Sequence, residues 1–237
     1  MSTELVSIIL PCYNEEGHLE KSIRLLIEES INFHFPFEFI FVEDKSKDNT
    51  RNLLKKLESE IKNAQFIYHT ENKGRGAAVK SGYAVAKGNI VGFIDVDLEI
   101  SPKYIPQFVE ALEKHDAAIG TRKYYSDTAL RALIRDTLSN LYSSLNRKIL
   151  GHTYADTEAG YKFFRKEPLR AFFEAPSNDH WFWDTEFVTY CFNNNLKVQE
   201  INVNFLRDHD KKSTVKVIRD SVYYLNELLK YKKRLKK

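Results

Sequence analysis

The chain has 237 residues, of which 43% are hydrophobic and 29% charged, and its formal net charge is +3. This composition is typical of a folded globular protein and excludes a disordered one. No apolar stretch approaches the roughly 18 residues of a membrane-spanning helix. Its two cysteines, Cys12 and Cys191, lack metal-ligand or CxxC spacing, which indicates a reducing compartment. The N-terminus reads as a buried strand and not as a signal peptide, so we expect a cytoplasmic protein.

Short apolar runs rich in β-branched and aromatic residues alternate with segments of helical spacing through the first half of the chain. The predicted strands are residues 6–10, 37–42, 64–69, 90–94 and 117–120. This alternation predicts an α/β fold with a mostly parallel, Rossmann-like sheet flanked by helices. Ligands of such sheets bind at the carboxyl ends of the strands, so we expect PCYNEE, EDKSKDNT and DVDLE on one rim.

The second half is less regular, but it contains no repeat and no linker. We expect a helix over 125–150, strands near 160 and 200, and a helix that begins at WFWDTEF and ends at an Asn run. Residues 1–210 are therefore predicted to form one domain, with a donor half (1–125) and an acceptor half (126–210).

The last segment, 211–237, holds ten Lys or Arg against two acids, so the rest of the chain is net acidic. Its apolar residues recur at helical intervals, which predicts a basic amphipathic helix. Such a helix either contacts a membrane surface or packs on the body of the protein. The acidic body and the lack of a recognisable motif argue against nucleic-acid binding.

Three acids, Asp95, Asp97 and Glu99, follow the strand at 90–94 in the stretch GFIDVDLE. If the chain stays extended, their side chains point to the same side. Converging carboxylates need a cation among them, and oxygen ligands suit Mg²⁺ or Mn²⁺ that also holds phosphate. The alternative is a solvated strand end. The acids at two other strand ends favour the metal.

The rim at EDKSKDNT carries Glu43 and Asp44, which helix capping does not explain, although it explains Asp48. The NKGRGAA segment resembles a dinucleotide-binding loop, but Val79 stands where the third glycine belongs and the loop follows the third strand, so we reject that interpretation. An amide cradle with Lys73 or Arg75 near a diphosphate remains.

Taken together, PCYNEE, EDKSKDNT, NKGRGAAVKSGYAVAKGNIVGFIDVDLE and GTRK resemble the successive signatures of family 2 glycosyltransferases with the GT-A fold, over about the first 125 residues. The resemblance implies a nucleotide-sugar donor and a metal, Mg²⁺ or Mn²⁺, on Asp95 and Asp97, with Glu99 within reach. It implies a donor site made by Pro11, Tyr13, Glu15, Glu43, Asp44, Lys73, Gly74, Asp95, Val96 and Asp97. One departure is Lys45, where the family pattern has Gly.

Later segments are similar to the polyprenyl-phosphate glycosyltransferases, the dolichyl-phosphate mannose synthase group. The match lies in DLE, in Arg122 with an R-x-x-x-S pair, in ADTEAGYKFF, in WFWDTEF and in KKST. The resemblance implies an acceptor-phosphate site made by Arg122, Arg135, Ser139 and Ser213. It implies metal-dependent, inverting transfer of a hexose, from a donor of the GDP-mannose or UDP-glucose type, to a polyprenyl or dolichyl phosphate at the cytoplasmic face of a membrane.

Two other functions stay open. A family 2 enzyme of cell-surface polysaccharide synthesis would use a saccharide hydroxyl and would need a base, for which Asp184 is the candidate. A non-catalytic nucleotide-sugar-binding protein would be expected to lack the metal acids. The predicted catalytic residues are therefore Asp95, Asp97, Arg122, Arg135 and Asp184, and Trp181 and Trp183 either pack in the core or face the sugar.

Overall fold

The structure, a computed structural model, describes residues 4–124, 144, 146–206 and 217–235. The first half forms β1 (Val6–Cys12), α1 (Leu19–Ser30), β2 (Phe37–Glu43), α2 (Thr50–Leu57), β3 (Ala64–Tyr68), α3 (Arg75–Val85), β4 (Ile90–Ile94), η1 (Pro102–Tyr104), α4 (Ile105–Ala111) and β5 (Ala117–Tyr124). The second half adds β6 (Tyr161–Arg165), α6 (Arg170–Glu174), α7 (Trp183–Asn193), β7 (Val198–Phe205) and α8 (Val217–Arg234).

Both halves of the described chain contribute to one seven-stranded sheet in the order β3-β2-β1-β4-β6-β5-β7. Strands β3, β2, β1 and β4 are parallel, as the alternating pattern predicted. Strand β6 runs antiparallel to β4 and to β5, and β7 runs parallel to β5. The predicted mostly parallel sheet is confirmed, and the second half extends it.

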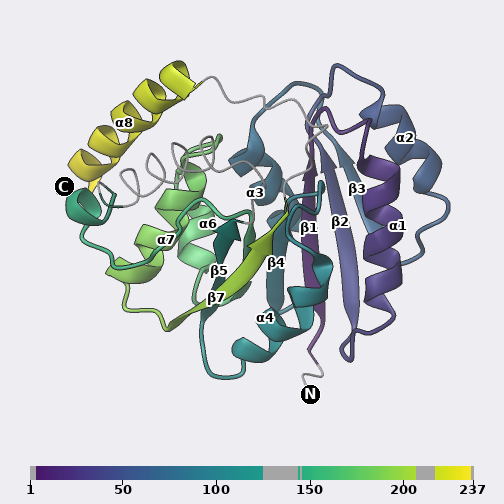
Figure 1. The fold of residues 1–237 in the computed structure, drawn as a ribbon, viewed down its shortest axis with the longest axis horizontal. Helices are drawn as coiled ribbons and strands as arrows, with labels where there is room; N and C mark the ends of the chain where they lie inside the picture. Colours follow the sequence, from purple (N-terminus) through teal and green to yellow (C-terminus); the bar gives the residue numbers. More distant parts are fainter. Residues whose placement is uncertain (1–3, 125–143, 145, 207–216, 236–237) are drawn as a thin grey trace.

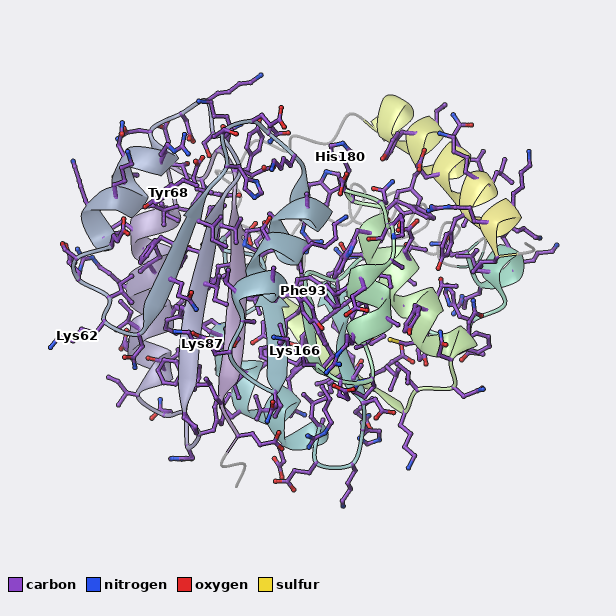
Figure 2. The ribbon with its side chains drawn as sticks, turned by 180° about the vertical axis from the view of Figure 1, so that it is seen from behind. Lys62, Tyr68, Lys87, Phe93, Lys166 and His180 are labelled. Atoms are coloured by element: carbon purple, nitrogen blue, oxygen red, sulfur yellow. The ribbon has the colours of Figure 1, made fainter. Side chains whose placement is uncertain are left out.

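Helices cover both faces of the sheet (Figure 1), and the side-chain alternation of β1 explains how. Ile8 and Leu10 point into the core shared with α1, α2 and α4. Ile9 points into a second core shared with α3 and α7. Phe93 of β4 lies in this second core, under the layer that faces the viewer in Figure 2. Each fully buried aliphatic or aromatic side chain contributes about 1.5–3 kcal/mol, so the strands are held from both sides.

The loops after β1 and β2 interlock at the carboxyl edge of the sheet. The register pairs Cys12 with Glu43, so both strands end at the same level. The Asn14 backbone donates to Ser46 Oγ at 3.1 Å, and Asn14 Oδ1 accepts from the Lys47 backbone at 2.8 Å. Strand β4, parallel to β1, ends at this edge as well. The predicted shared rim is confirmed.

The last described helix, α8, lies against the α7 side of the molecule (Figure 1). Its Tyr224 and Leu228 pack on Phe182 and on Leu150. Side chains one turn apart on another face are exposed: Val222, Leu225 and Leu229. The described part of the chain has no helix that is both long and apolar enough to cross a bilayer.

Candidate active site

The backbone turns directly after β4, so the predicted extended arrangement of the acids is wrong. The strand ends at Ile94, the Leu98 N–H donates to the Asp95 carbonyl at 3.2 Å, and Leu98 adopts a left-handed φ of 54°. A residue in that conformation reverses the chain and breaks the alternation of side chains. Val96 is nevertheless buried, as expected for a residue that anchors the turn.

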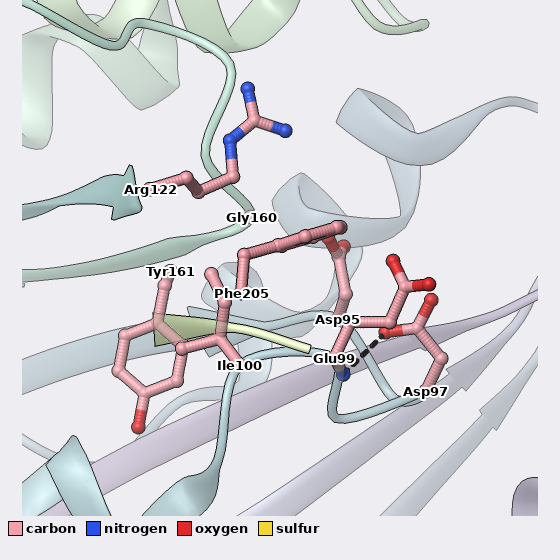
Figure 3. A pocket seen from close by; sticks show the side chains of 8 residues that line it. All are labelled: Asp95, Asp97, Glu99, Ile100, Arg122, Gly160, Tyr161 and Phe205. Carbon is pink, nitrogen blue, oxygen red and sulfur yellow. Dashed lines mark hydrogen bonds between the residues drawn. The ribbon is translucent and has the colours of Figure 1, made fainter. Parts of the chain in front are cut away.

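The turn still brings all three acids to one small pocket of about 20 Å³, which has room for roughly one ion or water. Its lining is Asp95, Asp97, Glu99, Ile100, Arg122, Gly160, Tyr161 and Phe205. Figure 3 shows the carboxylates on one side of this pocket and the Arg122 side chain on the other. The pocket therefore joins the predicted metal acids to a predicted acceptor residue.

The carboxylates are suited to a hard divalent ion, but they do not form a finished cage. Asp97 Oδ1 accepts the Glu99 N–H at 3.2 Å (Figure 3), while Asp95 Oδ1 is held by Arg75 at 2.8 and 3.0 Å. Within the described residues, no three His, Cys, Asp or Glu side chains converge as metal ligands. Mg²⁺ and Mn²⁺ take few carboxylates and complete their coordination with water and phosphate, so the donor chemistry fits such an ion beside Asp97 and Glu99.

Arg75 connects the end of β4 to α7 inside the protein. Its side chain keeps only 8% of its surface, and it donates to Asp95 through Nε and one terminal nitrogen and to Asp184 Oδ2 through the other. Asp184 Oδ1 accepts from Lys162 Nζ at 2.6 Å, and both of these side chains are buried. Two cations and two carboxylates thus form one network.

The network sets the charge state of its cations. Burial opposes the charge of Arg75, but Asp184 and Asp95 outweigh it and raise the pKa of the guanidinium. Burial lowers the pKa of Lys162, with Asp184 opposing the shift. The network leaves no space for a side chain at Gly160, because a Cβ there would lie 1.8 Å from Asp95 Oδ2.

Asp44, predicted to face the nucleotide, is buried and accepts hydrogen bonds from within the chain. Its donors are the backbone N–H groups of Lys73 (2.8 Å) and Gly74 (2.7 Å), Asn72 Nδ2 (3.0 Å) and His69 Nδ1 (2.7 Å). The other ring nitrogen of His69, Nε2, lies 2.9 Å from Ser81 Oγ, so the ring is held from both sides. The backbone amides that were predicted near a diphosphate thus donate to the Asp44 carboxylate in this structure.

Glu43 is also buried, and it accepts from the Ser46 backbone at 2.5 Å and pairs with Arg51 at 3.0 Å. Lys45 adopts a φ of 57°, so the position where the family pattern has Gly does require the left-handed conformation. Of the other predicted donor residues, Tyr13 and Lys73 are exposed, and Pro11 and Glu15 are partly buried at the rim. Tyr13 and Lys73 are therefore accessible from solvent, whereas Glu43 and Asp44 are buried and make contacts within the chain.

Arg122, the described member of the predicted acceptor-phosphate site, is held by Asp156. Arg122 donates to both Asp156 oxygens, from Nε at 2.7 Å and from a terminal nitrogen at 2.9 Å, and Glu158 lies 3.9 Å from the same guanidinium. Burial opposes the charge of Asp156, but Arg122 outweighs it and lowers the pKa of that carboxyl. Arg135, Ser139 and Ser213 lie outside the described residues.

Glu158 differs from its neighbour in its protonation. Burial raises the pKa of Glu158 to about 7; Arg122 opposes the rise, and Asp156 and Asp184 add to it. Its side chain nevertheless keeps 37% of its surface exposed, and solvent screening there limits the size of this shift. Sequence reasoning gave Glu158, Lys162 and Asp156 no definite role. The sequence DTEAGYK contained a usable indication, because two acids directly precede a strand that carries the buried Lys162.

The two tryptophans of WFWDTEF were predicted either to pack in the core or to face the sugar, and they differ in exposure. Trp183 is fully buried and contacts Phe93 edge to face, with ring centroids 5.3 Å apart. Trp181 is 59% exposed, and the Arg75 guanidinium lies 5.4 Å from its ring. Trp183 is therefore a core residue, and Trp181 stands at the edge of the charged network.

Residues 7–173 match the sequence profile described as "Glycosyl transferase family 2". The chain belongs to this family. The match spans β1 to α6 and so includes the rim, the loop that carries Asp156 and Glu158, and all of the pocket lining except Phe205. The chain thus contains a family 2 glycosyltransferase domain, as the order of its motifs predicted.

Relatives within the family include glycosyltransferase AglD of Haloferax volcanii, 29% identical over 95% of this chain. Dolichyl-phosphate beta-glucosyltransferases of Dictyostelium discoideum and Saccharomyces cerevisiae are 27% and 24% identical, each over 84% of this chain. The chain spans 36% of the length of AglD and 66% of the length of each glucosyltransferase. These relatives agree with the predicted polyprenyl-phosphate group.

Solved structures confirm the GT-A fold of this family 2 domain. Glucosyl-3-phosphoglycerate synthase from Mycobacterium tuberculosis, crystallised with Mn²⁺, UDP and glucosyl-3-phosphoglycerate, superposes with a TM-score of 0.72 at 19% identity. The match covers 96% of this chain and 79% of the synthase. At this identity the likeness establishes the architecture alone.

Proposed function

We propose that this domain is an inverting, metal-dependent transferase that moves a hexose from a nucleoside-diphosphate sugar to a polyprenyl phosphate. Mg²⁺ or Mn²⁺ beside Asp97 and Glu99 would neutralise charge on the departing diphosphate. Arg75 sets the position of Asp95 at the same pocket through its two hydrogen bonds. The acceptor oxygen attacks the anomeric carbon from the face opposite the leaving group, and Arg122 orients it.

The proposal that the acceptor is a phosphate rests on one observation, the environment of Asp184. This carboxylate was the candidate base for a hydroxyl acceptor, but it is 1% exposed and accepts from Lys162 at one oxygen and from Arg75 at the other. Because both oxygens of this carboxylate are engaged by buried cations away from solvent, a hydroxyl acceptor cannot contact them. A phosphate acceptor is already an anion at neutral pH and needs no base.

The position of Arg122 supports the same acceptor. Asp156 fixes its guanidinium in one orientation, and the residue lines the pocket that contains Asp97 and Glu99. Guanidinium groups bind phosphate through directed, charge-assisted hydrogen bonds. The names of the glucosyltransferase relatives favour glucose as the hexose and dolichyl phosphate as the acceptor class.

A lipid acceptor places the reaction at a membrane, and α8 is suited to that surface. Its exposed Val222, Leu225 and Leu229 form an apolar strip, and Lys232, Lys233 and Arg234 occupy its last turn. Apolar side chains beside cations are the composition of a helix that binds an anionic lipid surface from one side. The partner proposed for this strip is therefore the cytoplasmic leaflet.

A saccharide hydroxyl is the second candidate acceptor, and Glu158 is the observation that favours it. A carboxyl with a pKa of about 7 is matched to general-base catalysis at neutral pH. The two functions differ in what Glu158→Gln does. If Glu158 is the general base, Glu158→Gln abolishes transfer to a hydroxyl. If the acceptor is a phosphate, the variant keeps most of its transfer rate.

The test is a panel of acceptors given to wild type and to Glu158→Gln with labelled nucleoside-diphosphate sugars and Mg²⁺ or Mn²⁺. The panel contains a short polyprenyl phosphate, its dephosphorylated alcohol and oligosaccharides. Label on the polyprenyl phosphate alone, retained in Glu158→Gln, supports the proposal. Label on a saccharide that disappears in Glu158→Gln would replace it with the second function.

A further inference from the structure

A chain of buried hydroxyl groups connects α8 with the acceptor side of the site. Tyr224 OH forms a short hydrogen bond with Thr185 Oγ1 in α7, and Thr185 Oγ1 lies 3.2 Å from Thr157 Oγ1. The three residues are 8%, 0% and 4% exposed. Because buried hydroxyls must find partners, each of these groups restrains the next.

The far end of this chain lies between the two acids beside Arg122. Thr157 is preceded by Asp156, which receives both hydrogen bonds from the Arg122 guanidinium and a third from the Arg122 backbone at 3.2 Å. It is followed by Glu158, whose backbone N–H also donates to Asp156, at 3.1 Å. A movement of Thr157 therefore moves the group that orients Arg122.

The near end lies on the helix with the exposed apolar strip. Tyr224 faces the protein, where its ring contacts Phe182 edge to face with centroids 5.0 Å apart. Val222, two residues before it, and Leu225, the residue after it, are exposed. Helix α8 thus presents exposed apolar side chains on one side. On the other side it presents the Tyr224 hydroxyl, which is linked through Thr185 to Thr157 in the 156–158 loop.

We propose that Tyr224 is a positioning residue for the acceptor phosphate, acting through Thr185 and Thr157 on Asp156 and so on Arg122. The inference rests on the proposed function, because it takes Arg122 as the residue that binds the acceptor. It goes beyond that function in assigning a role to α8, which lies outside the segment 7–173 that matches the family. Docking of α8 on a membrane and orientation of Arg122 are then coupled.

The expected effect is confined to the acceptor. Loss of one hydrogen bond from the chain lets the 156–158 loop relax, and the weaker orientation of Arg122 raises the acceptor KM about fivefold. The donor KM stays the same, because the loops that carry Asp44 and Asp97 are not linked to Tyr224 by this chain. A purely structural defect would change both constants or lower kcat alone.

The experiment compares Tyr224→Phe with Tyr231→Phe on a short polyprenyl phosphate in detergent. Tyr231 packs on the same Phe182, but within the described part of the chain its hydroxyl is bonded to a helix carbonyl, at 3.5 Å, and not to the hydroxyl chain. Thr185→Val and Thr189→Val form a second matched pair, since the Thr189 hydroxyl is bonded to the backbone one turn away. We expect Tyr224→Phe and Thr185→Val to raise the acceptor KM and the two controls to leave it unchanged.

The outcomes separate the two levels of the account. Transfer by wild type with equal acceptor KM in Tyr224→Phe and Tyr231→Phe would overturn the positioning role and leave the proposed function standing. Absence of transfer to polyprenyl phosphate by wild type would overturn both. If Tyr224→Phe fails to fold, a normal acceptor KM in folded Thr185→Val would still contradict the inference.

Discussion

The Lys162 ammonium lies 2.6 Å from Asp184 Oδ1 in the interior of the domain, and neither side chain reaches solvent. Removing one partner of a buried ion pair leaves the other charge unpaired, at a cost of roughly 3–5 kcal/mol. We therefore expect Asp184→Asn to lower the free energy of unfolding by about that amount in urea denaturation.

The matched control for this variant is Asp179→Asn. Asp179 pairs with Lys80 at the same short distance of 2.6 Å, but it is 57% exposed, so its loss should change stability by no more than about 1 kcal/mol. Equal stability of the two variants would show that Asp184 is not held by its cations, and it would return Asp184 to the position of a possible base.

Gly160 is predicted to be indispensable for the geometry of Asp95. In Gly160→Ala the new Cβ would occupy the place of Asp95 Oδ2 and would also meet Arg75, so the network must shift and activity should fall by at least tenfold. Gly17→Ala is the control, because nothing lies within 4 Å of a Cβ there. Steady-state kinetics with both variants test this, and full activity in Gly160→Ala would contradict the assigned packing.

Glu158 should make stability depend on pH. Its pKa of about 7 lies above its ordinary value of 4.5, so the folded state favours the protonated form. The stabilisation is fully present below about pH 4.5 and is lost as the pH rises through about 7. The difference in unfolding free energy between wild type and Glu158→Gln should therefore change in this window, to the disadvantage of wild type at high pH. A difference that stays constant from pH 4.5 to 8 would contradict the raised pKa.

The apolar strip of α8 is predicted to bind lipid. Leu225→Glu with Leu229→Glu should remove sedimentation with phosphatidylserine-containing vesicles while leaving the melting temperature unchanged, because both side chains are already exposed. Binding by wild type should weaken as salt rises, since basic residues contribute through screened electrostatics. Ile31→Glu, at an exposed position after α1, is the control. Equal vesicle binding by wild type, the double variant and Ile31→Glu would show that the apolar strip does not bind lipid.

The sequence predicted the sheet and its rim because both follow from local periodicity. Alternation at Ile8, Ile9 and Leu10 fixed the two faces, and parallel strands place their ends together whatever the loops do. The turn at Leu98 was missed, because an apolar residue gives no signal for a left-handed conformation. The roles of Arg75 and Lys162 were also missed, since their partners, Asp95 and Asp184, are 20 and 22 residues away in sequence and meet only in the folded chain.

Asp44 shows that a predicted cluster of groups can form with a different partner from the one expected. The sequence predicted backbone amides of the NKGRGAA loop near a diphosphate, and the resemblance placed Asp44 in the donor site, but neither showed that these amides would bind Asp44 itself. The folded chain brings Lys73, Gly74 and His69 to Asp44 itself, so the hydrogen-bonding groups of the loop are satisfied within the chain. Sequence spacing predicts which side chains can meet at the rim. Burial, and the choice among several hydrogen-bond acceptors, determine which of them form hydrogen bonds.

The most direct measurement is transfer of label from GDP- and UDP-hexoses to a short polyprenyl phosphate, with Mg²⁺ or Mn²⁺ and with chelator, for wild type and Asp97→Ala. The account predicts a lipid-phosphate-linked hexose of inverted configuration that is lost with chelator and in Asp97→Ala. Product formed equally well by Asp97→Ala, or hydrolysis of the donor with no lipid product, would contradict it.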